Sequence, residues 1–425
     1  MPCSKMSTYK ASAEFFKNNV LNMLNKTLHY LCLLALAVLI FYPDEAVKVF
    51  TVASALAFFL IARDYKSLLP NKSLLILPVL LLAFGLLQMI WVAIYKQSVN
   101  EFTAAYRSYQ NAGKLMIFSA LIVYALQTTA RPTKAGLHKI LYIIIGLSLI
   151  TCIYAFYQKF TYPADFRVTL GLERATGTAY TMSGIALLGS QAILSLRFKC
   201  RDLLFIAHFI LTLTAIIFTQ TRAAILVFPV LNMVLFIIHH WRDKKLLSFW
   251  MTIFIIVGGI TFIPFKDKLL NRFERVAYEV NKYSNDDSNT SVGARLAMQK
   301  TGLLSGLEAP WGQSLELRSK HIKGLTKQEP MLSGALRFLN VHLHNEMIDT
   351  FSLKGILGVT MLISLYYMLL YTAIRLRSGI FLVISTSIAV YGLSDVVLYA
   401  KAEALGCMLF LCISLMLQPV LKSQA

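Results

Sequence analysis

Charged residues are scarce in this sequence of 425 residues. Asp, Glu, Lys and Arg make up 15% of it, whereas soluble domains carry roughly 25%. Hydrophobic residues make up 57%. Apolar stretches recur along the whole length, and many reach the ~20 residues that a helix needs to cross a bilayer. This composition excludes a series of soluble domains and predicts an all-α polytopic membrane protein.

Cysteine is also scarce, and none of the six cysteines falls in the long polar segment at residues 265–354. They occur in apolar or short basic segments, so neither a disulfide framework nor a Cys-x-x-Cys metal site is expected. The sequence has no His-Glu-x-x-His motif and no Asp-rich motif. We also expect no cleavable signal sequence at the N-terminus. Internal repeats and low-complexity linkers are not apparent.

The apolar stretches predict about twelve membrane-spanning helices. Hydrophobic residues within 11–25 have a spacing that predicts a helix lying at the membrane interface before the first span. We assign the spans, within several residues, to 27–43, 47–62, 73–95, 115–128, 138–157, 178–196, 203–219, 223–240, 246–264, 355–374, 379–399 and 402–420. The chain then divides into an N-terminal segment, nine spans, one long loop, and three spans with a short C-terminus, at 1–26, 27–264, 265–354 and 355–425.

The distribution of charge predicts the orientation of these spans. The 41 lysines and arginines outnumber the 21 acidic residues, for a net charge of +20. With the N-terminus inside, every short inside segment between spans is rich in lysine and arginine, as inner-membrane proteins require. The acidic residues on that side are Glu14, Asp64, Asp202 and Asp243. The basicity therefore indicates topology rather than nucleic-acid binding, with both termini cytoplasmic and residues 265–354 periplasmic.

The long loop should itself be helical. Residues 269–280 carry apolar side chains at helical spacing, which predicts an amphipathic helix on the membrane or on the bundle. Polar residues at 284–289 end it, and a second helix should begin near Ser291. Residues 309–312 form a turn, and another helix after Asn345 leads into the tenth span.

Arg222 and Arg295 are the first candidates for a binding site. Arg222 lies in a junction between two spans with almost no loop, where an arginine is costly without a partner or ligand. It either holds an anionic headgroup or snorkels to lipid phosphates. Arg295 is expected in the first turn of a helix, where it would join backbone N–H groups in binding phosphate; a solvated arginine is the simpler alternative. With Arg222 and Arg295, further basic residues of the outer loops could line a basic cleft, or each could be only a charge at its rim. These residues are Lys96, Arg107, Lys114, Arg167 and Arg174.

The segment His342–Glu346 is the second candidate. Asn345 is a plausible N-cap, and the positive end of a helix dipole disfavours a charged imidazole nearby. A neutral imidazole can act as a general base. The alternatives are a metal site, since His342, His344 and Glu346 would share one face of an extended segment, and capping or otherwise satisfied histidines. Asp395, near the outer end of a late span, could neutralise one of the arginines.

Together these groups suit chemistry on an anionic lipid carrier. Arginines would bind a diphosphate and stabilise it as a leaving group. A neutral histidine would accept a proton from a hydroxyl that attacks a sugar anomeric carbon, without a metal. Transport of the same lipid could use the same binding groups, although a transporter would carry charged residues deep in its spans.

Several motifs resemble the O-antigen ligases of Gram-negative bacteria, within the wider family of O-antigen ligases and polymerases. The resemblance covers nearly the whole chain and depends on the order and spacing of stretches at 219–223, 293–298, 340–346 and 352–355, together with 174–180 and 393–397. The pattern is closest to the lipopolysaccharide ligases of enteric bacteria.

This resemblance implies a membrane-embedded, GT-C-like, inverting glycosyltransferase of the inner membrane that needs neither metal nor cofactor. The donor would be undecaprenyl-diphosphate-linked O-antigen, and the acceptor a sugar hydroxyl of lipid A–core. Arg222, Arg295 and His344 carry over as catalytic residues, with His344 preferred to its neighbour because it directly precedes Asn345. Additional substrate-binding residues are expected to be Lys96, Arg107, Arg174, Tyr180, His342 and Asp395. An O-antigen polymerase, a protein O-oligosaccharyltransferase and a transporter of the lipid-linked glycan are the alternatives.

Overall fold

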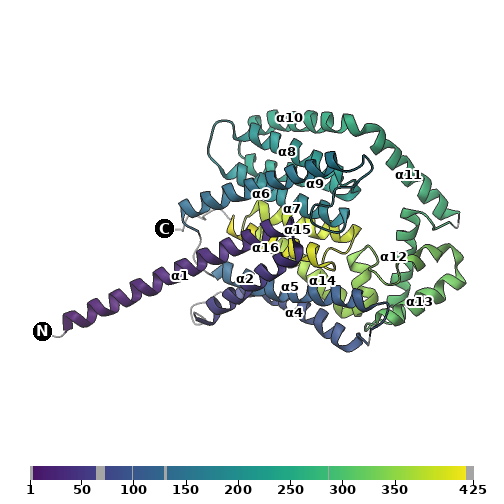
Figure 1. Cartoon of the computed structure of the whole chain (residues 1–425), viewed down its shortest axis with the longest axis horizontal. Helices are drawn as coiled ribbons and strands as arrows, with labels where there is room; N and C mark the ends of the chain where they lie inside the picture. Colours follow the sequence, from purple (N-terminus) through teal and green to yellow (C-terminus); the bar gives the residue numbers. More distant parts are fainter. Residues whose placement is uncertain (1–2, 64–71, 98, 129–131, 286, 418–425) are drawn as a thin grey trace.

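The computed structural model describes residues 3–63, 72–97, 99–128, 132–285 and 287–417, and every regular element within them is a helix. The ends of the first and last predicted segments, residues 1–2 and 418–425, lie outside the described residues. A helix occupies each of the twelve positions predicted for a span (Figure 1). These helices are α1 (Cys3–Leu39), α2 (Pro43–Arg63), α4 (Lys72–Tyr95), α5 (Thr103–Thr128), α6 (Lys134–Thr161), α7 (Ala175–Ser195), α8 (Arg201–Phe218), α9 (Arg222–His240), α10 (Lys244–Phe262), α14 (Glu346–Arg375), α15 (Gly379–Ser394) and α16 (Lys401–Met416).

The chain is a polytopic membrane protein. Among the described helices, eight are long and apolar enough to cross a bilayer, namely α1 from Asn19 onward, α2, α4, α6, α8, α9, α10 and α14. The remaining four differ for physical reasons. Helices α7 and α16 are almost entirely buried inside the bundle, α5 begins with polar residues, and α15 has only 16 residues. A helix surrounded by protein needs less apolar surface than one that faces lipid.

The N-terminal segment and the first predicted span form one continuous helix. Helix α1 runs without a break from Cys3 to Leu39, and its first half projects away from the bundle (Figure 1). An interfacial helix over 11–25 and a separate span from residue 27 were predicted for this region. Only the part from Asn19 has the length and hydropathy of a span.

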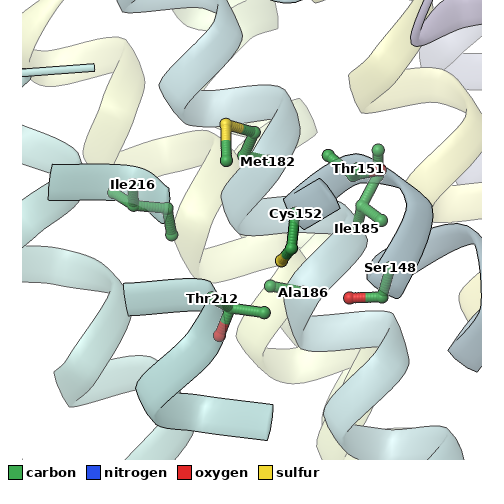
Figure 2. A pocket seen from close by; sticks show the side chains of 8 residues that line it. All are labelled: Ser148, Thr151, Cys152, Met182, Ile185, Ala186, Thr212 and Ile216. Atoms are coloured by element: carbon green, nitrogen blue, oxygen red, sulfur yellow. The ribbon is translucent and has the colours of Figure 1, made fainter. Parts of the chain in front are cut away.

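Helices α7, α15 and α16 form the centre of the bundle (Figure 1). α7 and α16 approach closely because Gly184 has no side chain, and a Cβ there would collide with the ring of Phe410. Figure 2 shows a small void between α6, α7 and α8 that is too narrow to hold a water molecule. It is lined by Ser148, Thr151, Cys152, Met182, Ile185, Ala186, Thr212 and Ile216. This void is a packing defect rather than a site.

The long loop folds into a helical unit of its own. It contains α11 (Lys266–Ser284), α12 (Ser291–Glu308), α13 (Leu315–Gln328) and the 3₁₀ segment η2 (Pro330–Phe338), followed by residues 339–345; we call this the loop unit. Its small core joins α12, α13 and η2. The helices predicted near 269–280 and from Ser291 are confirmed, as is the turn at 309–312. Helix α13 and η2 were missed, although Ser314 and Glu316 give α13 an N-cap and an acidic first turn.

Helix α14 joins the loop unit to the bundle through a kink at Gly355. This glycine has φ +63°, and a Cβ there would collide with the backbone carbonyl of Pro310. The Ile356 N–H donates to that same carbonyl at 2.8 Å. Residues 346–354 pack against α12, and the kink falls at the residue where the tenth span was predicted to begin.

Candidate functional site

The segment 341–344, which carries both histidines, is held by a buried ion pair. Arg318 of α13 is 0% exposed and donates from Nη1 to Oδ1 of Asp349 at 2.9 Å. The same arginine donates from Nη2 to the carbonyl oxygen of Val341 at 2.9 Å, and Asp349 Oδ1 accepts from the Leu343 N–H at 3.1 Å. The pair thus binds the backbone on both sides of His342. Sequence reasoning missed both residues, since neither belongs to a recognisable motif.

A polar and aromatic layer lies beneath this ion pair. The hydroxyl of Tyr109 in α5 donates to Oδ2 of Asp349 at 2.6 Å. Lys354 is 4% exposed, and its ammonium lies 4.5 Å from the ring centroid of Tyr109 and 5.1 Å from that of Trp91. A buried ion pair contributes little net stability but is strongly destabilising when one partner is removed. We therefore infer that this layer fixes the position of the segment 341–344 rather than adding net stability.

His344 adopts a backbone conformation that is uncommon for residues other than glycine. Its φ is +51°, in the left-handed region that favours glycine. The next residue, Asn345, caps α14 as predicted, and its side-chain oxygen accepts from the N–H groups of Met347 and Ile348 at 3.1 Å each. Its amide donates to the carbonyl of Leu393. Such local strain persists only where surrounding contacts determine the geometry, and here they direct His344 toward the end of α15.

His344 forms a hydrogen-bonded dyad with Asp395. Its Nδ1 lies 2.9 Å from Asp395 Oδ1. Burial alone would raise the pKa of Asp395, but the hydrogen bond from His344 and the charges of the two nearby histidines lower this pKa to about 2. The carboxylate is therefore ionised and can only accept, so the proton of a neutral His344 ring resides on Nδ1. No hydrogen bond engages Nε2 within the described residues, so this nitrogen can accept a proton from a substrate. The expected pairing of Asp395 with an arginine is wrong, since its partner is His344.

His342 is the less accessible of the two histidines. Its side chain is 4% exposed, against 21% for His344. Burial lowers the pKa of His342 to about 4, so the ring is neutral near pH 7. Arg174 Nη1 lies 3.5 Å from His342 Nε2, and a guanidinium can only donate. His342 thus forms a wall of the site, packed against the rings of His344 and Tyr399.

A metal at this position was the alternative prediction. Glu346 is not part of it, because its carboxylate accepts instead from the Tyr366 hydroxyl and the Leu398 N–H. Asp395 takes its place, and the ligand atoms of His342, His344 and Asp395 lie within 4.8 Å of one another. However, the guanidinium of Arg174 faces the same cluster and opposes a second cation. The arrangement fits a hydrogen-bonded dyad better than a metal centre.

Tyr180 and Arg295 lie near the dyad. The Tyr180 hydroxyl is 3.1 Å from that of Ser394, the residue before Asp395, and the charge of Arg295 acts on it. Arg295 is exposed and lies one turn into α12, rather than in the first turn as predicted. The N–H groups of that first turn are already occupied, since Gly293 donates to Thr290 Oγ1 and Val292 to a carboxylate of α11. Arg295 therefore does not share a ligand with the helix N-terminus.

Arg222 is the first residue of α9 and borders a large cleft. The junction before it is tight, with Gln220 at φ +55°. Arg167 fixes this junction by donating to the Thr219 carbonyl at 2.9 Å and to Thr221 Oγ1 at 3.3 Å. The cleft has a volume of about 940 Å³. Its basic lining residues are Lys159, Arg222, Lys266 and Arg275, and its walls are apolar side chains of α8, α9, α10 and α11.

Two predicted binding residues, Lys96 and Arg107, are not linked to the dyad by a hydrogen bond or an ion pair within the described residues. Lys96 follows α4, and Arg107 is exposed on α5. Within the described part of the chain, neither side chain forms a hydrogen bond or an ion pair with the residues around His344. Their neighbours Asn100 and Tyr106 bind Glu316 of α13 instead.

Comparisons with known proteins agree with the earlier resemblance. A family profile described as O-antigen ligase matches residues 207–363, a range that includes Arg222, Arg295 and His344. The chain is 34% identical over 333 residues to the O-antigen ligase of Escherichia coli strain K12, covering 78% of each protein. It is 24% identical over 264 residues to an uncharacterized protein of Haemophilus influenzae, covering 60% of this chain and 64% of the other.

Proposed function

This chain belongs to the O-antigen ligase family, and from that membership we propose a donor, an acceptor and a role for each site residue. The protein is an O-antigen ligase, an enzyme of the glycosyltransferase type in lipopolysaccharide biosynthesis. The donor is O-antigen linked to undecaprenyl diphosphate. The acceptor is a sugar hydroxyl of lipid A–core. Transfer inverts the anomeric carbon and requires no metal.

The His344–Asp395 dyad is the observation that carries this proposal. The acceptor hydroxyl oxygen attacks the anomeric carbon as its proton moves to His344 Nε2. The bond between that carbon and the diphosphate oxygen breaks, and undecaprenyl diphosphate leaves with the electron pair. Asp395 stabilises the imidazolium that forms, as the carboxylate of a catalytic triad does. Water then takes the proton from His344 and restores the base.

Arg222 and Arg295 neutralise the diphosphate. Guanidinium groups bind phosphate oxygens in a bidentate manner and stabilise charge on a leaving group without a metal. The cleft beside Arg222 combines basic residues with apolar walls. It therefore suits the diphosphate together with the first isoprene units of the carrier. Arg174 and Tyr180 complete the sugar side of the site.

The proposed topology has twelve spans with both termini in the cytoplasm, in a GT-C-like arrangement. The loop unit and the site then face the periplasm of a Gram-negative inner membrane. Support comes from the charge distribution and from the helix at each of the twelve predicted positions. It also comes from Tyr180, His344 and Asp395, which are brought to one place by three different elements.

Transfer in liposomes tests the proposal. Purified protein is given undecaprenyl-diphosphate-linked O-antigen and lipid A–core, and wild type is compared with His344→Ala. The matched control is His321→Ala, which changes a loop-unit histidine that binds Ser305 and Glu308. We expect capped lipopolysaccharide from wild type and control, with at least a 10²-fold loss in His344→Ala. Chelation with EDTA should leave the rate unchanged.

Three outcomes would contradict the proposal. Movement of the lipid-linked glycan between leaflets without product would indicate a transporter. Transfer to glycan chains or pilin-like proteins, but not to lipid A–core, would indicate a sister enzyme. Loss of activity in EDTA with rescue by one divalent ion would overturn the role of His344 as a base.

A further inference from the structure

A second large cleft lies at the other end of the bundle, away from the dyad. It has a volume of about 1030 Å³ and lies between the start of α6, the α7–α8 and α14–α15 junctions, and the ends of α9 and α16. In the proposed topology all of these ends are cytoplasmic. We call it the inner cleft. Nothing in the glycosyl-transfer mechanism uses it.

The inner cleft is strongly basic. Of the residues that the structure describes, no acidic one lines it, whereas four arginines do: Arg197, Arg201, Arg242 and Arg377. Arg201 is compensated, because its Nε donates to Asp202 Oδ1 at 2.9 Å. Among the described residues, the side chains of the other three have no hydrogen bond and no ion pair. Three uncompensated cations around one opening create a positive potential that attracts an anion.

The walls of the inner cleft are apolar, unlike those of a site for a free anion. Leucine and isoleucine side chains such as Leu141, Leu235 and Ile380 line it beneath the arginines. At the rim, Trp241 is 62% exposed, and the Lys244 ammonium lies 3.5 Å from its ring centroid. Tryptophan and lysine are typical of the boundary between headgroups and acyl chains. The inner cleft thus presents positive charge to a lipid headgroup and apolar surface to the acyl chains.

We propose that the inner cleft binds an anionic phospholipid whose headgroup carries two phosphates. Two phosphates match the three uncompensated arginines, since each guanidinium can take two phosphate oxygens. Basic pockets between membrane helices on the cytoplasmic side bind lipids of this class. The site is separate from glycosyl transfer, and only its assignment to the inner leaflet depends on the proposed topology.

The experiment compares two triple variants of the full-length protein in nanodiscs. Arg197→Gln, Arg242→Gln and Arg377→Gln together remove the uncompensated charges of the cleft. The control combines Lys139→Gln, Lys199→Gln and Lys245→Gln, which removes the same charge from exposed residues at the same end of the bundle that do not line the cleft. Thermal unfolding midpoints are measured in phosphatidylcholine discs doped with increasing cardiolipin, and in undoped discs with soluble diphosphate.

We expect cardiolipin to raise the unfolding midpoint of the wild type and of the control. The cleft variant should need about 10²-fold more cardiolipin for half the effect, because each of the three basic residues removed contributes about a fivefold factor to binding. Transfer activity in undoped discs should be the same in all three proteins, which separates this test from that of the proposed function.

Two results would overturn the inference. If the control loses as much response as the cleft variant, the lipid responds to general surface charge and the cleft is not a site. If soluble diphosphate raises the midpoint of the wild type as far as cardiolipin does, the occupant is a soluble anion and not a lipid.

Discussion

The two halves of the candidate site are built in opposite ways. His344 and Asp395 are held by a dense set of contacts, with backbone fixed through Arg318 and Asp349. Arg295 is exposed, and Arg222 borders an open cleft. In the proposed mechanism, the proton-accepting half would be complete before substrate arrives, whereas the phosphate-binding half would receive its anions from the donor. A group that accepts a proton must be held in place before the reaction. A mobile lipid diphosphate, in contrast, can be bound by basic side chains that adjust their positions.

The sharpest test of the fixed half is Asp395→Asn. An amide can turn its NH₂ group toward His344 Nδ1 and so move the ring proton to Nε2, which removes the base. We expect kcat to fall by about 10⁴-fold at neutral pH, by analogy with a triad carboxylate. Single-turnover transfer with saturating donor measures this. A loss of less than tenfold would mean that Asp395 does not orient the base.

The open half is tested by Arg222→Ala and Arg222→Lys. Removal of one group that stabilises a leaving-group charge costs about 10²-fold in rate. Lysine keeps the charge but loses the bidentate geometry, so it should restore only part of the activity. Steady-state transfer kinetics are compared with the control Lys114→Ala, an exposed basic residue of α5. Equal activity of all three variants would show that Arg222 only contacts lipid.

A double variant separates positioning from folding in the fixed half. Arg318→Met alone leaves a buried carboxylate unpaired and should destabilise the protein by about 3–5 kcal/mol. Adding Asp349→Leu removes the unpaired charge and should recover most of that loss. The double variant still lacks the contacts to Val341 and Leu343.

For this double variant we expect about a tenfold lower kcat with an unchanged KM, since a small displacement of a catalytic group is costly. Thermal unfolding and transfer kinetics are measured on the same preparation. A double variant with wild-type kcat would show that the ion pair serves folding alone.

The last prediction concerns the pH dependence of stability, which the His342 side chain affects without a role in transfer. His342 is neutral in the fold because burial lowers its pKa to about 4, whereas the unfolded chain takes up a proton near pH 6.5. The unfolded state therefore binds more protons between these values, and stability falls as the pH drops from 6.5 to 4, by about 3 kcal/mol over the whole range. His342→Gln should show a smaller decrease in unfolding midpoint between pH 7 and pH 5. An identical decrease would assign the effect to other groups.

The sequence predicted the parts of the fold that depend on periodicity. The apolar stretches located a helix at all twelve positions, and the spacing within 269–280 located α11. The continuity of α1 was missed, because composition does not show whether two adjoining helical segments form one helix. Helix α13 carries a capping serine, but its buried apolar side chains are only Leu315 and Ile322, which are too few to produce a helical period.

Within the site, residues in motifs were easier to find than their partners. His344, Arg222 and Arg295 were singled out, and their catalytic roles stay predictions. Arg318 and Asp349 were missed because their importance depends on tertiary contacts across 31 residues. The predicted partner of Asp395 was wrong for the same reason, since its actual partner, His344, lies 51 residues away in the chain. Contacts between residues so far apart in the chain produce neither a periodic pattern nor a local spacing in the sequence.

The tight junction between α8 and α9 has a consequence for the length of the polymer. With almost no loop before it, Arg222 is fixed at the end of a membrane helix. In the proposed mechanism, only the sugar next to the diphosphate must reach this depth. Every later repeat would then extend away from the bilayer, beyond this junction. The enzyme should then accept short and long chains alike, and the distribution of lengths on the cell surface would be decided before the polymer arrives.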